Sequence, residues 1–200
     1  MGDAQRETQL GSGTLTFVRH IPNMITVCRV LLIPVLAWLL VERNYAGALT
    51  VFAIAAVSDF FDGVIARRFG FMTEFGARLD PIADKLTMLV TTVMLAAQGW
   101  VPVWLAATIV LRDVTIVSGA VAYHLMVGRI AISPTWLSKL NTALEFVTLT
   151  LVLADAASAA DFRTWLPALF ALVLVTVLAS GAQYVWVWSR KAKEDARGSA

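Results

Sequence analysis

The segment Ser58–Lys85 reads SDFFDGVIARRFGFMTEFGARLDPIADK, and it decides how the rest of the chain is interpreted. Eight residues between Asp59 and Asp84 are charged, which is about twice the 15% found over the whole chain. Apolar stretches lie on both sides of this segment. An aspartate at membrane depth costs about 2.5–3.5 kcal/mol on insertion scales, so such acids need a partner or a function.

The composition of the whole chain indicates a membrane protein. Of its 200 residues, 58% are hydrophobic, and the mean hydropathy is +0.74. Soluble chains contain about 45–50% apolar and about 25% charged residues. The composition therefore excludes an ordinary soluble globule, and a net charge of only +2 excludes nucleic acid as the expected partner.

The apolar stretches predict an all-α integral membrane protein with six transmembrane helices, because a spanning helix needs about 20 apolar residues. The predicted spans are Met24–Leu40, Ala46–Ile65, Pro81–Gln98, Val101–Val127, Leu137–Ala154 and Trp165–Trp188. A short amphipathic surface helix is expected at residues 15–21, with a loose tail as the alternative. We expect residues 1–200 to form a single domain, with residues 1–21 and 189–200 as cytoplasmic segments.

The placement of basic residues predicts the orientation of these spans. Thirteen of the sixteen Lys and Arg residues fall on or near the side that holds both termini, whereas only Arg43 and Arg163 fall on the other side. Basic residues favour the cytoplasm. We therefore expect both termini and the acidic segment at the cytoplasmic face of the inner membrane. No cleavable signal is expected at the N-terminus. The aromatic residues expected as interfacial anchors are Trp136, Trp165, Trp186 and Trp188.

The spacing of four aspartates predicts a metal site. Asp59 and Asp62 are three residues apart and share one helix face, and Asp80 and Asp84 are four apart on the next helix. The short intervening loop makes the two helices antiparallel neighbours, so the pairs can form one cluster. Four carboxylates repel one another unless cations neutralise them. Mg²⁺ is commonly bound by carboxylates together with substrate phosphates. A lone ion-pair role for an intramembrane acid is the structural alternative.

Small residues beside these acids point to a bulky ligand. Gly63, Ala66 and Gly76 leave room for a ligand group to approach the helix backbone closely. Arg67 supplies a planar cation suited to phosphate, although Arg67 and Arg68 also fit an ordinary basic flank of a span. Carboxylates, gaps and an arginine together indicate phosphoryl-group chemistry at the membrane face.

The motif Asp59-x-x-Asp62-Gly63-x-x-Ala66-Arg67, followed after eight residues by Gly76-x-x-x-Asp80-x-x-x-Asp84, resembles the signature of the CDP-alcohol phosphotransferase (phosphatidyltransferase) family. The resemblance extends from His20 to about Glu145. It implies six transmembrane helices, usually a homodimer, and an active site open to the cytoplasmic leaflet. The implied reaction is attack of an alcohol on the β-phosphorus of a CDP-linked lipid, which releases CMP.

The resemblance also implies roles for individual residues. Asp59, Asp62 and Asp80 should hold two divalent cations, Mg²⁺ or Mn²⁺, and Asp84 should complete the metal site and act as general base. The residues expected to receive the CDP moiety are Gly63, Ala66, Arg67 and Gly76, with Asn23, Thr26 and Arg29 lining the pocket. The alternative for these last three is a simple helix-start role.

The acceptor alcohol is the least determined feature. The stretch from Ile21 to Arg29 resembles the glycerophospholipid branch of the family. At Ser138 and Asn141 the chain resembles the cardiolipin synthases, because phosphatidylglycerophosphate synthases tend to carry Gly and Lys at these positions. Replacing a lysine by Asn141 suits phosphatidylglycerol, which is less charged than glycerol 3-phosphate. We therefore expect CDP-diacylglycerol and phosphatidylglycerol as substrates, with glycerol 3-phosphate as the alternative acceptor.

Two further interpretations concern the charges in the later spans. Arg112, Lys139 and Asn141 are expected to bind the acceptor, with Arg112 and Lys139 on its phosphate. The alternative for Arg112 is a structural ion pair with Asp113 or Glu145. In a rival class, an ion-coupled transporter, the acids would carry ions. The clustering of the acids at one face and the absence of internal repeats argue against it.

Overall fold

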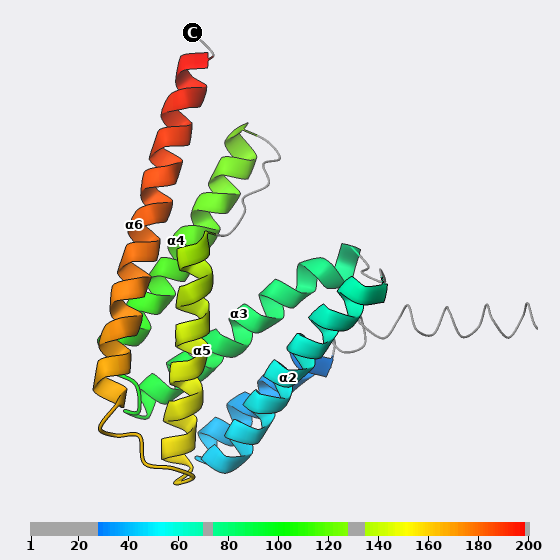
Figure 1. The fold of residues 1–200 in the computed structure, drawn as a ribbon, viewed down its shortest axis with the longest axis vertical. Coiled ribbons are helices and arrows are strands. Elements are labelled where there is room, and N and C mark those ends of the chain that lie inside the picture. Colours follow the sequence, from blue (N-terminus) through cyan, green and yellow to red (C-terminus); the bar gives the residue numbers. More distant parts are fainter. Residues whose placement is uncertain (1–27, 70–73, 128–134, 199–200) are drawn as a thin grey trace, which may run out of the picture. The chain divides into compact units, whose positions relative to one another are not determined.

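The computed structural model describes the backbone of residues 28–69, 74–127 and 135–198, and every regular element in these ranges is an α-helix (Figure 1). Side chains are described in the same ranges except at residues 59–81, 120–127, 185 and 187–198. The chain divides into two compact units, residues 1–91 and 92–200. The boundary falls inside one continuous helix, and we describe each unit by itself.

The first unit contains the helix Cys28–Val41, helix α2 (Tyr45–Phe69) and most of helix α3 (Glu74–Ala97). The first helix ends with Arg43 in the left-handed conformation, where the Asn44 N–H donates to Leu39 O and the Arg43 N–H donates to Leu40 O. This pair of bonds satisfies carbonyls that the helix end leaves open. Asn44 then caps α2, because its Oδ1 accepts from the Gly47 N–H at 3.0 Å.

Helix α3 extends beyond the apolar span predicted for it. That span begins at Pro81, and the helix begins at Glu74. The sequence spacing places Asp80 on the same helix as Asp84, and this is confirmed, because α3 continues through Pro81 despite the missing N–H at that position. The helix therefore carries Gly76, Asp80 and Asp84 on one continuous backbone.

The second unit contains helices α4 (Val103–Val127), α5 (Trp136–Ala156) and α6 (Leu166–Gly198). Helix α6 packs against both α4 and α5, and α5 runs antiparallel to the other two (Figure 1). Thr135 caps α5, because its hydroxyl accepts from the Ser138 N–H at 3.3 Å. The backbone of α6 continues ten residues beyond the predicted end at Trp188.

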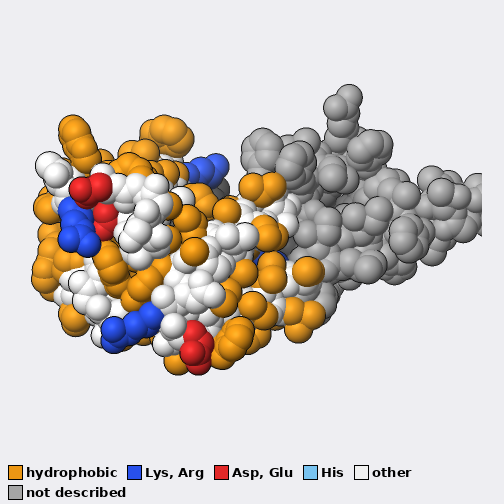
Figure 2. Space-filling model, turned by 90° about the horizontal axis from the view of Figure 1, so that it is seen from below, with side chains coloured by type: hydrophobic (Ala, Val, Ile, Leu, Met, Phe, Trp, Pro, Cys, Tyr) orange, Lys and Arg blue, Asp and Glu red, His pale blue; other side chains and the backbone are white. Residues whose placement is uncertain are grey.

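The second unit buries polar side chains beside its apolar core and exposes large apolar side chains on its outside. Polar side chains are buried between the helices, and large apolar side chains are exposed in their middle portions. The buried polar set comprises Thr92, Arg112, Asn141, Glu145, Thr148, Asp155, Thr176 and Ser180. The exposed apolar set includes Val114, Val117, Val147, Val175 and Leu178. Figure 2 shows hydrophobic side chains over much of the described surface, with charged ones in small groups. An extensive exposed apolar surface indicates a non-aqueous environment or a partner.

Helix length and aromatic placement agree with a bilayer. The segments Trp136–Ala156 and Leu166–Tyr184 are long and apolar enough to cross a membrane, and Cys28–Val41 and Tyr45–Ser58 are shorter apolar helices, among the described residues. Trp136 begins α5 and is 78% exposed, and Trp165 lies just before α6 at the other end of the unit. The 21 residues of α5 span about 30 Å, which is the thickness of the hydrocarbon core.

Candidate active site

The acidic motif lies on two helices, as the spacing predicts. Asp59 and Asp62 both belong to α2, and Asp80 and Asp84 both belong to α3. Helix α2 also carries Gly63, Ala66 and Arg67. Gly76 lies in the first turn of α3. The helical assignment confirms that each aspartate pair is carried by a single helix.

Asp84 is the one acid of this motif whose side chain is described, and it forms an ion pair. Its Oδ1 accepts a hydrogen bond from Arg29 Nη1 at 2.8 Å. The Arg29 side chain is 1% exposed, whereas that of Asp84 is 42% exposed. The guanidinium therefore lies inside the first unit, and the carboxylate lies at the edge of the packed interior, partly exposed.

The contact between Arg29 and Asp84 was not predicted from sequence. Arg29 was assigned to a pocket lining or to a helix start, and its partner lies 55 residues away. A signal was present, because an arginine within a predicted span must pair with something. Sequence spacing could not identify Asp84 as that partner, since only tertiary packing brings the Cys28–Val41 helix to α3.

Several predicted site residues lie outside the described part of the structure. Asn23 and Thr26 precede residue 28. The side chains of the following predicted site residues are not described: Asp59, Asp62, Gly63, Ala66, Arg67, Gly76 and Asp80. Among the described residues no group of three or more His, Cys, Asp and Glu side chains is found. The metal and CDP assignments therefore stay predictions.

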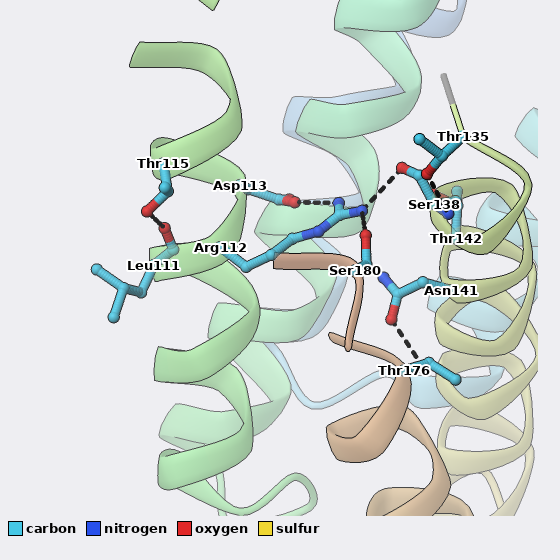
Figure 3. A network of polar contacts seen from close by, with 10 residues as sticks. All are labelled: Leu111, Arg112, Asp113, Thr115, Thr135, Ser138, Asn141, Thr142, Thr176 and Ser180. Atoms are coloured by element: carbon cyan, nitrogen blue, oxygen red, sulfur yellow. Dashed lines mark hydrogen bonds and ion pairs between the residues drawn. The ribbon is translucent and has the colours of Figure 1, made fainter. Parts of the chain in front are cut away.

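Arg112 joins the three helices of the second unit (Figure 3). Its Nη1 donates to Asp113 Oδ1 at 2.9 Å, and its Nη2 donates to Ser138 Oγ on α5 at 2.8 Å and to Ser180 Oγ on α6 at 2.7 Å. The Arg112 side chain is 4% exposed and that of Asp113 is 16% exposed. The residues expected as ion-pair partners in a structural role for Arg112 are Asp113 and Glu145. The structure shows the pair with Asp113.

Asn141 lies three residues after Ser138 on α5 and is fully buried (Figure 3). Its Oδ1 lies 2.9 Å from Thr176 Oγ1, and the same hydroxyl lies 2.9 Å from Val173 O. A hydroxyl has one proton, so it donates to one of these acceptors at a time. Lys139, by contrast, is exposed near the start of α5.

Comparison with known proteins identifies the family. Residues 19–187 match the CDP-alcohol phosphatidyltransferase family. The chain belongs to this family. The match covers well over half of the chain and includes the whole aspartate motif. It also confirms the enzyme class that the motif predicts, and it removes the support for a transporter.

Individual relatives of this phosphatidyltransferase divide between two reactions. A cardiolipin synthase (CMP-forming)/mitochondrial hydrolase fusion protein from Schizosaccharomyces pombe is 34% identical over 82% of the chain, which spans 30% of that protein. The cardiolipin synthase (CMP-forming) of Homo sapiens is 31% identical over 82% of the chain and 60% of its own length. A CDP-diacylglycerol–glycerol-3-phosphate 3-phosphatidyltransferase from Pseudomonas fluorescens is 38% identical over 78% of the chain and 82% of its own length.

Proposed function

We propose that this protein is a cardiolipin synthase that transfers the phosphatidyl group of CDP-diacylglycerol to a hydroxyl of phosphatidylglycerol. In this reaction the acceptor oxygen bonds to the β-phosphorus, the bond from that phosphorus to the CMP oxygen breaks, and CMP leaves. The observation that supports the transfer from CDP-diacylglycerol is the complete aspartate motif, placed on α2 and α3 in a chain of the CDP-alcohol phosphatidyltransferase family. The choice of phosphatidylglycerol as acceptor rests on Ser138 and Asn141.

We assign the general base to Asp84. Its carboxylate is half exposed at the surface of the first unit, so an acceptor hydroxyl can approach it. The base would take the hydroxyl proton as the oxygen attacks phosphorus, and a correctly placed base contributes about 10²–10⁴-fold to the rate. Asp84 lies one helical turn after Asp80 on α3, so the base and a proposed metal ligand share one rigid element.

The donor chemistry of the motif fits divalent cations. Four carboxylates on two helices are hard oxygen ligands, and Mg²⁺ and Mn²⁺ both accept such ligands. We propose that Asp59, Asp62, Asp80 and Asp84 hold two of these ions. When bound, the ions would supply positive charge that stabilises the attacking and leaving oxygens.

The nucleotide would lie along the small residues of the two helices. Gly63, Ala66 and Gly76 have little or no side chain to obstruct the CDP moiety, and Arg67 offers planar donors to its phosphates. Asn23 and Thr26 are proposed as further contacts to CDP. The expected loss of donor affinity on replacing Gly63 by a larger residue is a direct consequence of this assignment.

The acceptor contacts are proposed for Arg112, Lys139 and Asn141, with unequal support. Lys139 is exposed and can reach a lipid phosphate. Arg112 already donates to Asp113 and two serines, and Asn141 is already paired with Thr176. Lys139 therefore has the best support as a phosphate ligand, and the other two would support it through the packing of α5.

A second acceptor is favoured by one specific comparison. The Pseudomonas fluorescens relative, whose name specifies glycerol 3-phosphate, is matched over most of its length. Phosphatidylglycerophosphate synthesis is therefore the alternative reaction. Both reactions use CDP-diacylglycerol and release CMP, so the alternatives differ in the acceptor alone.

We place the proposed reaction at the cytoplasmic face of the inner membrane, in a homodimer of six-span chains with both termini inside. The exposed apolar surface of the second unit supports insertion in lipid, and the distribution of basic residues supports this orientation. Both apolar helices α5 and α6 have sufficient length for such spans.

The deciding experiment offers the two acceptors separately to the purified protein in mixed micelles with CDP-diacylglycerol and Mg²⁺ or Mn²⁺. Formation of cardiolipin and CMP from phosphatidylglycerol is the expected result. Phosphatidylglycerophosphate formed from glycerol 3-phosphate alone would establish the alternative. EDTA-treated protein gives the background rate of CMP release. If neither acceptor raises CMP release above that background, both the proposed and the alternative reaction are contradicted.

A further inference from the structure

The ion pair between Arg29 and Asp84 joins a buried arginine to a partly exposed carboxylate. Arg29 is among the largest fully buried side chains of the described residues, and its Nη1 lies 2.8 Å from Asp84 Oδ1. Asp84 is 42% exposed. One end of the pair is therefore fixed inside the helix packing, and the other end is partly exposed.

Burial makes this contact hard to give up. Moving a guanidinium out of water costs several kcal/mol unless an anion and hydrogen bonds compensate. Asp84 supplies an anion to Arg29 at a charge-assisted bond length. Because the arginine is held by packing, the carboxylate that it contacts is restrained in turn. An exposed aspartate without such a contact would rotate among several rotamers.

We propose that Arg29 is a positioning residue that holds the Asp84 carboxylate in the orientation from which it acts on the acceptor hydroxyl. The inference rests on the proposed function, which makes Asp84 the base. In this assignment Arg29 contacts the base and not the substrate. Positioning matters because a displacement of about 1 Å at a reacting group can cost about 100-fold in rate.

Replacement of Arg29 tests this role. R29M keeps the length and apolar character of the side-chain stem and removes the guanidinium. We expect kcat to fall about 100-fold, while the KM values for CDP-diacylglycerol and for the acceptor stay within about threefold. R29K keeps the charge but not the planar fork, and we expect its kcat to be about tenfold below that of the wild type. R43M removes an exposed arginine from the same unit and serves as the matched control.

A double variant shows whether Arg29 acts through Asp84. If it does, adding R29M to D84N lowers the residual rate no further, because residues that act as one unit are not additive. A further loss of about 100-fold in R29M/D84N would mean that Arg29 acts independently, and the inference would be wrong. Thermal unfolding in detergent identifies any variant that fails to fold. In that case R29K decides alone, since a wild-type kcat for R29K overturns the proposal.

The failure of this inference is distinguishable from the failure of the proposed function. A wild-type protein that releases no CMP with either acceptor contradicts the function itself. A wild-type protein that is active, together with a folded R29M of undiminished kcat, contradicts only the positioning role. An R29M variant with normal kcat and a large rise in the KM for CDP-diacylglycerol would make Arg29 a binding residue, which also overturns the proposal.

Discussion

At the scale of single residues, the position of Asp84 combines two properties that rarely coincide in one carboxylate. It is held by a buried arginine, and it remains 42% exposed. A structural ion-pair partner would be expected deeper in the packing, and a free surface acid would be expected without a buried cation. The arrangement suits a group that must be accessible and oriented at once.

Replacing Asp84 by Asn should abolish turnover without unfolding the protein. The amide keeps the size of the side chain and an oxygen for Arg29, but it cannot accept a proton as a base does. We expect CMP release to fall by about 10²–10⁴-fold, measured by product analysis in mixed micelles. E42Q, which neutralises an exposed acid near the end of the first helix, is the control. Near-normal turnover in D84N would remove the base assignment.

Two glycines should respond in opposite directions to alanine. Gly99 has a φ of +83°, in the left-handed region, so G99A should lower the free energy of unfolding by about 1 kcal/mol although nothing lies within 4 Å of the added Cβ. Gly181 lies inside α6, and an added Cβ would stand 3.7 Å from Arg112 Cγ, which is ordinary contact. G181A should raise the stability by about 0.5–1 kcal/mol. Thermal unfolding in detergent compares the two, and a more stable G99A would contradict the strain argument.

At the scale of the helices, polar contacts define how the second unit is packed. Arg112 contacts α5 through Ser138 and α6 through Ser180, and Asn141 on α5 contacts Thr176 on α6 (Figure 3). Lipid offers no hydrophobic drive for helices to associate, so van der Waals packing and interhelical hydrogen bonds carry much of the specificity. The buried polar stripe therefore fixes which faces of α4, α5 and α6 meet.

Loss of the Arg112 contacts should weaken this packing. R112M removes one ion-pair contact of Asp113, whose side chain is only 16% exposed, together with two serine contacts. We expect the free energy of unfolding to fall by about 3 kcal/mol, as for other broken buried pairs. T115V on the same helix removes a hydroxyl that bonds only its own backbone at Leu111 and should change stability by less than about 0.5 kcal/mol.

The same variant separates the two interpretations of Arg112. Unchanged unfolding of R112M together with a raised acceptor KM would show that Arg112 binds the acceptor phosphate and is not a structural contact. A destabilised R112M whose acceptor KM is unaltered would establish the structural role. The unfolding midpoint in detergent and the kinetics of the folded fraction give the two measurements.

At the scale of the whole molecule, the exposed apolar surface of the second unit is the physical argument for membrane insertion. The middle of α6 exposes Val175 and Leu178, while Thr176 and Ser180 on the same helix are buried. In water such a surface would associate or aggregate. In a bilayer it is the expected outer face of a helix, and the polar side chains find partners inside.

Cysteine labelling tests this placement. In a C28S background, which removes the single native cysteine, V175C should resist a membrane-impermeant maleimide in intact cells. D161C lies in the exposed connection between α5 and α6 and should be labelled from outside the cell if the proposed orientation is right. Labelling of V175C at the rate of D161C would contradict a lipid-facing α6. Labelling of D161C only after cell lysis would reverse the orientation.

Much of the site could be predicted from local sequence because its logic is local. The spacings in Asp59-x-x-Asp62 and Asp80-x-x-x-Asp84 require only that each pair lies on one helix, and α2 and α3 satisfy this requirement. The apolar runs likewise placed most helices within a few residues. The apolar span predicted from Pro81 covers only the hydrophobic part of α3, whose backbone begins at Glu74.

Composition and motif spacing by themselves determined the class of this protein, namely an apolar helical chain of the CDP-alcohol phosphatidyltransferase family with a four-aspartate motif. Only the tertiary structure decided the partners of the buried charges. Arg29 meets Asp84 across 55 residues, and Arg112 joins α4 to both α5 and α6. Periodicity reports which face of a helix is polar, but it carries no information on which distant helix covers that face. That choice follows from packing and from the cost of leaving a buried charge without a partner.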